Sequence, residues 1–168
     1  STPFADENPP SFIPSALWTT YTQSSVNPSS AAVQNSFLSD GTVSGSVAAT
    51  NADGVNGWIK LDLRRNYLID RVIVGTSNSS ATAPLADKTL TDNKIVDYSL
   101  DGTNWKTAFN TGTLPGFGVY KFDVDFHARY LRIRNASGSS DILAVSEFYA
   151  LSPGQSYTAG TFTPVKLN

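Results

Sequence analysis

The feature that most constrains this chain is a set of short runs in which apolar and polar side chains alternate. Ile59, Leu61 and Leu63 fall on one face of an extended segment, and the charged residues between them fall on the other. Residues 119–126 and 129–134 alternate in the same way. A period of two is typical of strands that bury one face. No segment sustains a 3.6-residue apolar period with caps at both ends, so the pattern predicts an all-β protein.

Turn signals separate further strand-like runs. Residues 96–100 and 105–109 flank Asp101-Gly102-Thr103-Asn104, which predicts a hairpin. Residues 68–74 are rich in β-branched side chains but are interrupted by Asp70-Arg71, and residues 144–151 close the series. Short strands at regular spacing favour a sandwich or a barrel.

The two ends differ from the middle. Residues 1–13 are rich in proline, which predicts an extended N-terminal arm. We assign residues 14–151 to the sandwich and residues 152–168 to a C-terminal tail or an extra strand. The long segment 76–93 is expected to be a surface loop of the kind that often carries function. Because the chain opens at Ser1 without a signal-like run, we expect a mature product or an excised domain.

Composition excludes several classes of function. The 168 residues are 40% apolar and 15% charged, which fits one folded domain. Scattered basic residues and a formal charge of −2 argue against nucleic acid as a partner, and no apolar run is long enough for membrane insertion. The absence of cysteine rules out disulfides and thiolate metal sites. The neutral polar surface favours an extracellular, secreted or surface-exposed protein.

Six stretches in order carry a resemblance to a known family. The chain resembles the discoidin, or factor V/VIII C-type, domains, a galactose-binding-like family that overlaps with the family-32 carbohydrate-binding modules. The stretches span residues 37–151 and are 38–41 (LSDG), 57–63 (GWIKLDL), 67–72 (YLIDRV), 98–105 (YSLDGTNW), 128–134 (ARYLRIR) and 145–149 (VSEFY).

The resemblance implies an antiparallel β-sandwich jelly-roll of eight strands, with its termini close together and ligand loops at one end. The chain departs from the family in two ways. It cannot form the disulfide that ties the termini of vertebrate members, and residues 42–56 stretch the usually tight segment between Asp40-Gly41 and Trp58.

The resemblance also implies a structural Ca²⁺ site. Asp40 and Glu147 would each supply a carboxylate, Thr42 an oxygen, and backbone carbonyls near Phe37 and Ser146 would complete the shell. Oxygen donors are what this hard cation prefers. The alternative is that Glu147 pairs with an arginine and that Asp40-Gly41 is an ordinary turn.

Candidate glycan contacts are an aromatic face and a few polar groups on loops, because sugar rings combine apolar C–H faces with polar rims. Each can equally serve packing alone. The candidates are Trp18 and Tyr21 in the first loop, Asn78 and Asp87 in segment 76–93, and Phe117 between two glycines.

Two other groups have competing interpretations. Trp58 and Trp105 are predicted to be core aromatics, with a stacking platform as the alternative. The row Tyr130, Arg132 and Arg134 could bind an acidic sugar or form cross-strand pairs with carboxylates such as Asp62 or Asp123.

Nothing in the residues indicates an enzyme. The single histidine, His127, lies in an expected turn, no cysteine is present, and no spacing points to a catalytic carboxylate pair.

The sequence therefore predicts a non-catalytic, lectin-like carbohydrate-binding module that targets a larger extracellular protein to a glycan or glycoconjugate. One alternative is a structural, adhesion or receptor-binding domain of a phage, viral or surface protein that contacts protein instead. A lipid-binding C-type domain is a third possibility.

Overall fold

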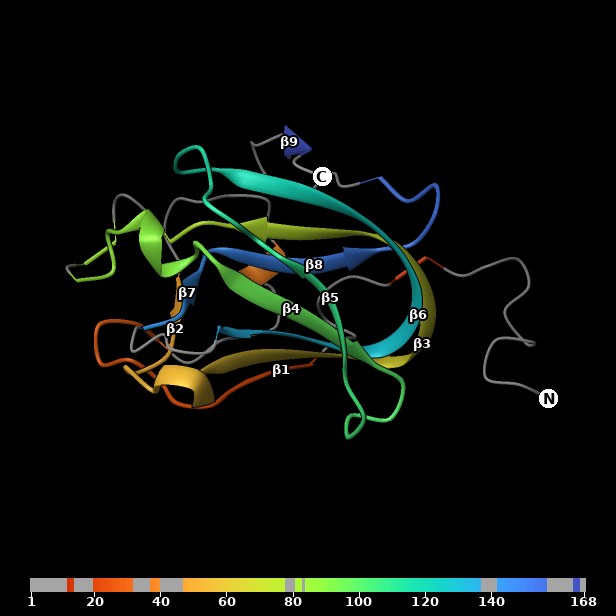
Figure 1. The fold of residues 1–168 in the computed structure, drawn as a ribbon, viewed down its shortest axis with the longest axis horizontal. Helices are drawn as coiled ribbons and strands as arrows, with labels where there is room; N and C mark the ends of the chain where they lie inside the picture. Colours follow the sequence, from red (N-terminus) through yellow and green to blue (C-terminus); the bar gives the residue numbers. More distant parts are fainter. Residues whose placement is uncertain are drawn as a thin grey trace.

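The computed structural model describes residues 12–13, 20–31, 37–39, 47–77, 81–82, 84–136, 142–156 and 165–166. Strands make up nearly all of its regular structure, as predicted (Figure 1). The strands are β1 (Thr20–Gln23), β2 (Ala48–Ala49), β3 (Trp58–Gly75), β4 (Lys94–Ser99), β5 (Lys106–Asn110), β6 (Val119–Asn135), β7 (Ala144–Val145), β8 (Glu147–Leu151) and β9 (Val165–Lys166). Three short 3-10 turns are η2 (Phe37–Ser39), η3 (Gly54–Asn56) and η4 (Lys88–Leu90).

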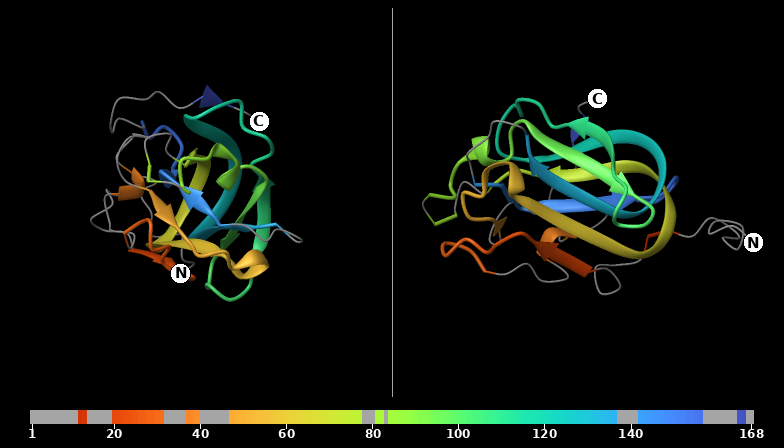
Figure 2. Two further views of the ribbon diagram at one scale, coloured as in Figure 1. Left: turned by 90° about the vertical axis from the view of Figure 1, so that its left-hand side faces the viewer. Right: turned by 60° about the horizontal axis from the view of Figure 1, so that its bottom comes forward.

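Two long strands, β3 and β6, build both layers of a sandwich. Their halves at Trp58–Asp62 and Tyr130–Arg134 pair with each other, and this first layer runs in the order β1, β3, β6, β4, β5. Both strands then bend, and their other halves form the second layer with β8 beside β3 and β9 beside β6 (Figures 1 and 2). All pairings are antiparallel except β6 with β9.

The bends coincide with interruptions of the ladder. The pairing of β3 with β6 shifts register between Asp62 and Tyr67 and again between Ile69 and Arg71. At the first shift Arg64 takes a positive φ of 73°, and its N–H donates to Asp62 Oδ1 at 2.8 Å. The segments 58–63 and 68–74 are therefore parts of one strand, and the same holds for 119–126 and 129–134 within β6.

The core lies between the layers. Ile59, Leu61 and Leu63 are fully buried, as their alternation predicts, and they share one apolar cluster with Leu131 of β6 and Phe148 of β8. The predicted hairpin is also present, since β4 pairs with β5 across the turn at 100–105.

The ends of the sandwich domain lie side by side. Ile13, at the end of the expected arm, is buried, and it exchanges hydrogen bonds with the side chain of Gln155 at 3.0 and 2.8 Å. In the tail, Val165–Lys166 adds the extra strand β9 to β6. Among the residues described, no helix is long and apolar enough to cross a membrane.

Candidate functional site

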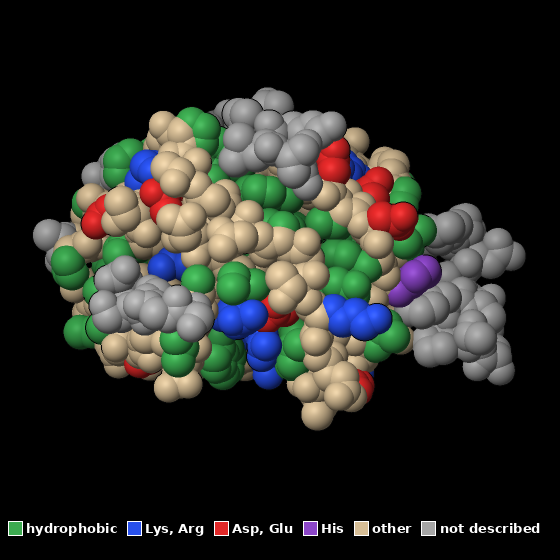
Figure 3. Space-filling model, in the orientation of Figure 1, with side chains coloured by type: hydrophobic (Ala, Val, Ile, Leu, Met, Phe, Trp, Pro, Cys, Tyr) green, Lys and Arg blue, Asp and Glu red, His purple; other side chains and the backbone are tan. Residues whose placement is uncertain are grey.

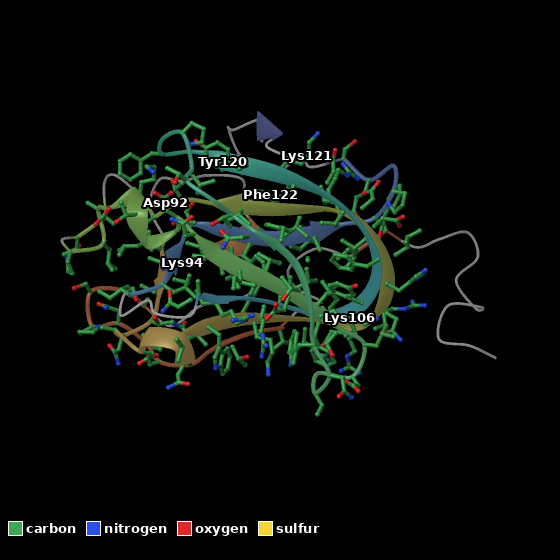
Figure 4. The ribbon with its side chains drawn as sticks, in the orientation of Figure 1. Asp92, Lys94, Lys106, Tyr120, Lys121 and Phe122 are labelled. Carbon is green, nitrogen blue, oxygen red and sulfur yellow. The ribbon has the colours of Figure 1, made fainter. Side chains whose placement is uncertain are left out.

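Two loops form a rim at one end of the sandwich, at the left of Figure 1. We define the loop rim as segments 76–93 and 111–118. The N–H of Thr76 donates to the carbonyl of Gly118 at 2.9 Å and joins the bases of the two loops, and the N–H of Leu114 donates to Asp92 Oδ1 at 3.0 Å. Figure 4 places Asp92 at this end, close to Lys94 at the start of β4. The rim is therefore a cross-linked platform.

Phe117 is the exposed aromatic of the loop rim. Its side chain is 44% exposed, between Gly116 and Gly118. The hydroxyl of Tyr120 donates to the carbonyl of Gly116 at 2.7 Å and accepts from its N–H at 3.1 Å. Thr76 Oγ1 accepts from the N–H of Gly118 at 3.0 Å. The turn is held on both sides, so the ring is presented to solvent from a fixed backbone.

Asp87 is also exposed on the loop rim, where it caps η4. Its Oδ1 accepts from the N–H and the hydroxyl of Thr89 at 2.9 and 2.6 Å. Beneath it, Leu85 and Leu90 belong to a second apolar cluster with Ala144. The long loop is therefore anchored by its own small core.

The remaining predicted glycan residues divide into two groups. Trp18 and Asn78 lie outside the described residues. Tyr21 was expected on a loop but lies on β1, where it is 7% exposed and its hydroxyl donates to the carbonyl of Phe148 at 2.7 Å. The expectation of a loop position was wrong, because Tyr21 pairs with Leu61 of β3 in the sheet and its side chain faces the core.

The candidate calcium residues are placed in part. Glu147 begins β8 and is fully buried, and the hydroxyl of its neighbour Ser146 is buried with no hydrogen-bond partner in the described structure. Burial, followed by the charge of Glu147, raises the pKa of Tyr21 well above its ordinary value. The turn η2 packs against β8, whereas Asp40 and Thr42 lie outside the described residues. Within the described ranges, no three His, Cys, Asp or Glu side chains group as a metal site.

The two tryptophans predicted for the core lie on the outer face of the first layer. Trp58 and Trp105 are both half-buried and neither belongs to the apolar core. Trp58 shares the outer face with Lys60, whose Nζ lies 5.1 Å from the centre of the indole ring. Arg132 stacks on Trp105 at 4.2 Å. The prediction failed because alternation along β3 sends Trp58 outward when Ile59 points inward.

The arginines of the outer face pair with carboxylates, although mostly not the predicted ones. Asp62 pairs with Arg129 through both carboxylate oxygens, at 2.9 and 3.1 Å. Arg132 and Arg134 instead share Asp97 of β4. A hollow of about 300 Å³ opens beside them, lined by Val55, Asn56, Trp58, Arg132 and Arg134.

A larger hollow of about 450 Å³ lies at the end opposite the loop rim. Its wall includes Tyr98 and Phe126, whose rings stack at 3.9 Å, and the exposed Leu100. Lys106, which Figure 4 labels near this end, also lines it. The site has an apolar wall with mixed charges at its edge, so its geometry selects no particular ligand charge.

The architecture defines a class of protein: an antiparallel sandwich with galactose-binding-like topology and a rim of anchored loops. The F5/8 type C domain family model matches residues 19–148, and the chain belongs to that family. No curated protein sequence matches the chain.

Solved structures share the fold at low sequence identity. A fucose-binding module from Streptococcus pneumoniae is 22% identical, with a TM-score of 0.62 over 79% of this chain and 89% of that one. A fucolectin from striped bass serum is 15% identical, with a TM-score of 0.66 over 86% and 52%. A family 32 module from Clostridium perfringens, solved with galactose, is 12% identical, with a TM-score of 0.58 over 84% and 98%.

Proposed function

We propose that this protein is a non-catalytic carbohydrate-binding module that holds a glycan on its loop rim. The observation that carries the proposal is Phe117, an exposed aromatic ring on a turn that Tyr120 and Thr76 hold in place. An aromatic ring covers the C–H face of a sugar, and a preformed turn avoids the entropic cost of ordering a loop on binding. The exposed carboxylate of Asp87 adds a polar group that sugar hydroxyls can reach.

The similar structures support a saccharide as the ligand. By their descriptions, the pneumococcal module binds fucose and the clostridial module was solved with galactose. A further neighbour, the lectin domain of lectinolysin, was solved with the Lewis B antigen. All three share this sandwich, so its loops are the parts that vary to fit different sugars.

We propose a binding role without catalysis because carboxylates that could act as acids or bases already serve structure. Asp97 holds two arginines, and Asp101 caps the turn between β4 and β5. We further propose that the module is extracellular and targets a larger protein to glycan-bearing surfaces. Shallow sites of this kind bind weakly one at a time, so several copies would act through avidity.

A glycan array with three proteins tests the proposal. We expect wild type to bind a defined set of glycans and Phe117→Ala to lose at least tenfold in affinity. The matched control is Leu100→Ala, which removes an exposed apolar side chain at the opposite end. Equal loss in Leu100→Ala would move the site to the larger hollow. An array on which wild type binds nothing would favour the structural or adhesion alternative.

We also propose that Glu147, with Asp40 and Thr42, holds a structural Ca²⁺. The fully buried carboxylate beside the unsatisfied hydroxyl of Ser146 fits an oxygen-donor site. When bound, the ion would brace the start of β8 against the segment after η2.

Thermal unfolding with and without EDTA tests the metal site. We expect Ca²⁺ to raise the midpoint of wild type by several degrees, Mg²⁺ to have little effect, and Glu147→Gln and Asp40→Asn to abolish the Ca²⁺ shift. Asp125→Asn, an exposed carboxylate on β6, is the control and should keep the shift. A wild-type midpoint that ignores both Ca²⁺ and EDTA would remove the metal from the proposal.

A further inference from the structure

The outer face of the first layer carries a row of cations outside the loop rim. The ladder sets Trp58 opposite Arg134 and Lys60 opposite Arg132. On the other side of β6, Asp97 is opposite Arg132. Figure 3 shows Lys and Arg side chains gathered around an acidic one on the lower part of this view. We call the hollow lined by Val55, Asn56, Trp58, Arg132 and Arg134 the cationic hollow.

Asp97 orients the two guanidinium groups. Its side chain is only 2% exposed, and its Oδ2 accepts from Nε of Arg132 at 2.7 Å and Nε of Arg134 at 2.6 Å. Its Oδ1 accepts from the hydroxyl of Thr107 at 3.0 Å. Both arginines are engaged through Nε alone, and no hydrogen bond joins their terminal nitrogens to any described residue. Trp105 stacks against Arg132 and restrains it further.

The hollow has an excess of positive charge. Arg132 and Arg134 line the hollow, and Lys60 lies beside it, with its Nζ 5.1 Å from the centre of the Trp58 ring. With Asp97 as the one negative charge, the local sum is +2 (3 − 1) in a chain whose formal charge is −2. Guanidinium groups present paired N–H donors that match the oxygens of a carboxylate or a sulfate. Because Asp97 holds the arginines in place, little side-chain entropy is lost when an anion binds.

An aromatic wall completes the site. Trp58 is half-buried at the edge of the hollow, and Asn56 of η3 adds an amide beside it. An indole suits the C–H face of a sugar ring, while an amide suits hydroxyl groups. A volume of about 300 Å³ is at the lower end of the range for small-ligand sites, which suits one sugar residue.

We propose that the cationic hollow is a second glycan site that binds the carboxylate or sulfate of an acidic sugar residue. The anion would accept from the terminal nitrogens of Arg132 and Arg134 while the ring stacks on Trp58. The inference rests on the proposed glycan-binding function but concerns a site on a different face from Phe117. A single hollow with one aromatic wall favours a saccharide over a nucleic acid, which would need a longer basic track.

Indole N–H signals in a nuclear magnetic resonance titration test this site. The chain has three tryptophans, so the spectrum has three indole signals, and Trp58→Phe assigns one of them. The ligands are matched pairs: glucuronic acid with glucose, galacturonic acid with galactose, sialyllactose with lactose, and galactose 6-sulfate with galactose. We expect at least one acidic member to move the Trp58 signal, with an effect that weakens as salt rises, while its neutral partner leaves the signal in place.

Substitutions of one arginine that lines the hollow, Arg134, and one that lies outside it, Arg129, supply the test and its control. Arg134→Gln should weaken the acidic ligand at least tenfold, and Arg134→Lys, which keeps the charge but not the fork, should have an intermediate effect. Arg129→Gln removes an arginine of the same strand that pairs with Asp62 outside the hollow, and it should change affinity less than twofold. Dispersed amide spectra establish that each variant is folded.

The outcomes separate this site from the loop rim. A Trp58 signal that no acidic sugar moves, or that both members of every pair move equally, overturns the inference. If sugars bind and Phe117→Ala removes that binding while Trp58 stays silent, the proposed function stands and the second site fails. If no glycan, acidic or neutral, binds at all, both fail.

Discussion

Three aspartates illustrate how neighbouring groups decide what a carboxylate does. Asp97 is buried under two arginines, and Asp62 faces Arg129. Burial alone would raise the pKa of Asp62, but the hydrogen bonds from Arg129 and from the N–H of Arg64 outweigh it and lower the pKa. Asp101 is exposed, and the N–H groups of Asn104 and Thr103 hold its pKa well below the ordinary value. Each carboxylate therefore stabilises a different local structure.

The first prediction concerns Asp101→Asn. We expect the variant to unfold at lower urea than wild type at pH 7, because an amide lacks the negative charge that strengthens the bonds from the N–H groups of Thr103 and Asn104 to Oδ1. Its nitrogen also cannot accept the bond that Asn104 Nδ2 donates to Oδ2. Since the folded pKa of Asp101 is lowered, its stabilisation is present above the unfolded pKa of about 3.9 and is lost as pH falls through the folded value. The difference between the two urea midpoints should therefore shrink below about pH 4.

Asp125→Asn is the control for this effect, because Asp125 is an exposed carboxylate on β6. A gap between Asp101→Asn and wild type that stays constant from pH 7 to pH 2 would contradict the role given to the carboxylate.

At the scale of elements, the end of β3 and the start of β8 approach each other closely within the second layer. Gly75 pairs with Glu147, and a Cβ added at Gly75 would lie 2.5 Å from Ser146 Oγ and 2.7 Å from Glu147 Cβ. The backbone N of Glu147 would be 2.9 Å away. Only a residue without a side chain fits, because backbone atoms of β8 cannot move aside independently.

The second prediction follows from this contact. Gly75→Ala should lower the free energy of unfolding by about 1–3 kcal/mol, the usual cost of overpacking. Gly116→Ala is the matched control, because a Cβ there meets nothing within 4 Å, and it should change stability much less. Urea denaturation of the three proteins measures both effects. Equal stability of Gly75→Ala and wild type would mean that β8 can shift away from β3.

At the scale of the whole molecule, two buried tyrosines tie separate parts together. Tyr21 of β1 reaches the carbonyl of Phe148 across the sandwich. Tyr149 lies beside the junction of the two ends, where its hydroxyl donates to the carbonyl of Ile13 at 3.4 Å. Burial raises the pKa of Tyr149 to about 12. The folded state therefore keeps this phenol neutral at a pH where the unfolded chain ionises it.

The third prediction is a loss of stability in alkali. Because the folded pKa of Tyr149 is raised, its contribution is present below the unfolded pKa of about 10 and is lost as pH rises towards 12. Tyr149→Phe should show a smaller drop in urea midpoint between pH 8 and pH 11 than wild type. Tyr130→Phe, which removes a phenol on the outer face instead, is the matched control. A Tyr149→Phe drop as large as that of wild type would count against this linkage.

Local patterns predicted much of the fold because alternation and turn chemistry act between neighbours in the chain. The inward positions of Ile59, Leu61 and Leu63 and the hairpin around Asp101 follow from such patterns. Asp70-Arg71 interrupts an apolar run where the ladder of β3 shifts register, so even the irregularity has a signal in the sequence. The exposure of Phe117 was likewise foreseeable from its two glycine neighbours.

The outward position of Trp58 follows from the alternation that buries Ile59, but the place of Trp105 and the role of Asp97 were not foreseeable in the same way. Alternation gives two faces but does not say how much of an outward side chain its neighbours cover. Asp97 is buried because Arg132 and Arg134 approach from an adjacent strand, more than thirty positions along the chain. Asn56 shares one hollow with Arg132 and Arg134 because η3 lies against β6.

The sequence by itself determined that the chain forms short antiparallel strands with one buried face, and it carried enough ordered motifs to reveal the family. Only the tertiary structure decided which strands continue through a bend, how the two layers meet, and which polar groups share a surface. The physical reason is the separation along the chain over which each effect acts, because strand propensity and alternation depend on adjacent residues. A binding surface instead depends on side chains that register, twist and loop anchoring bring together from distant parts of the chain.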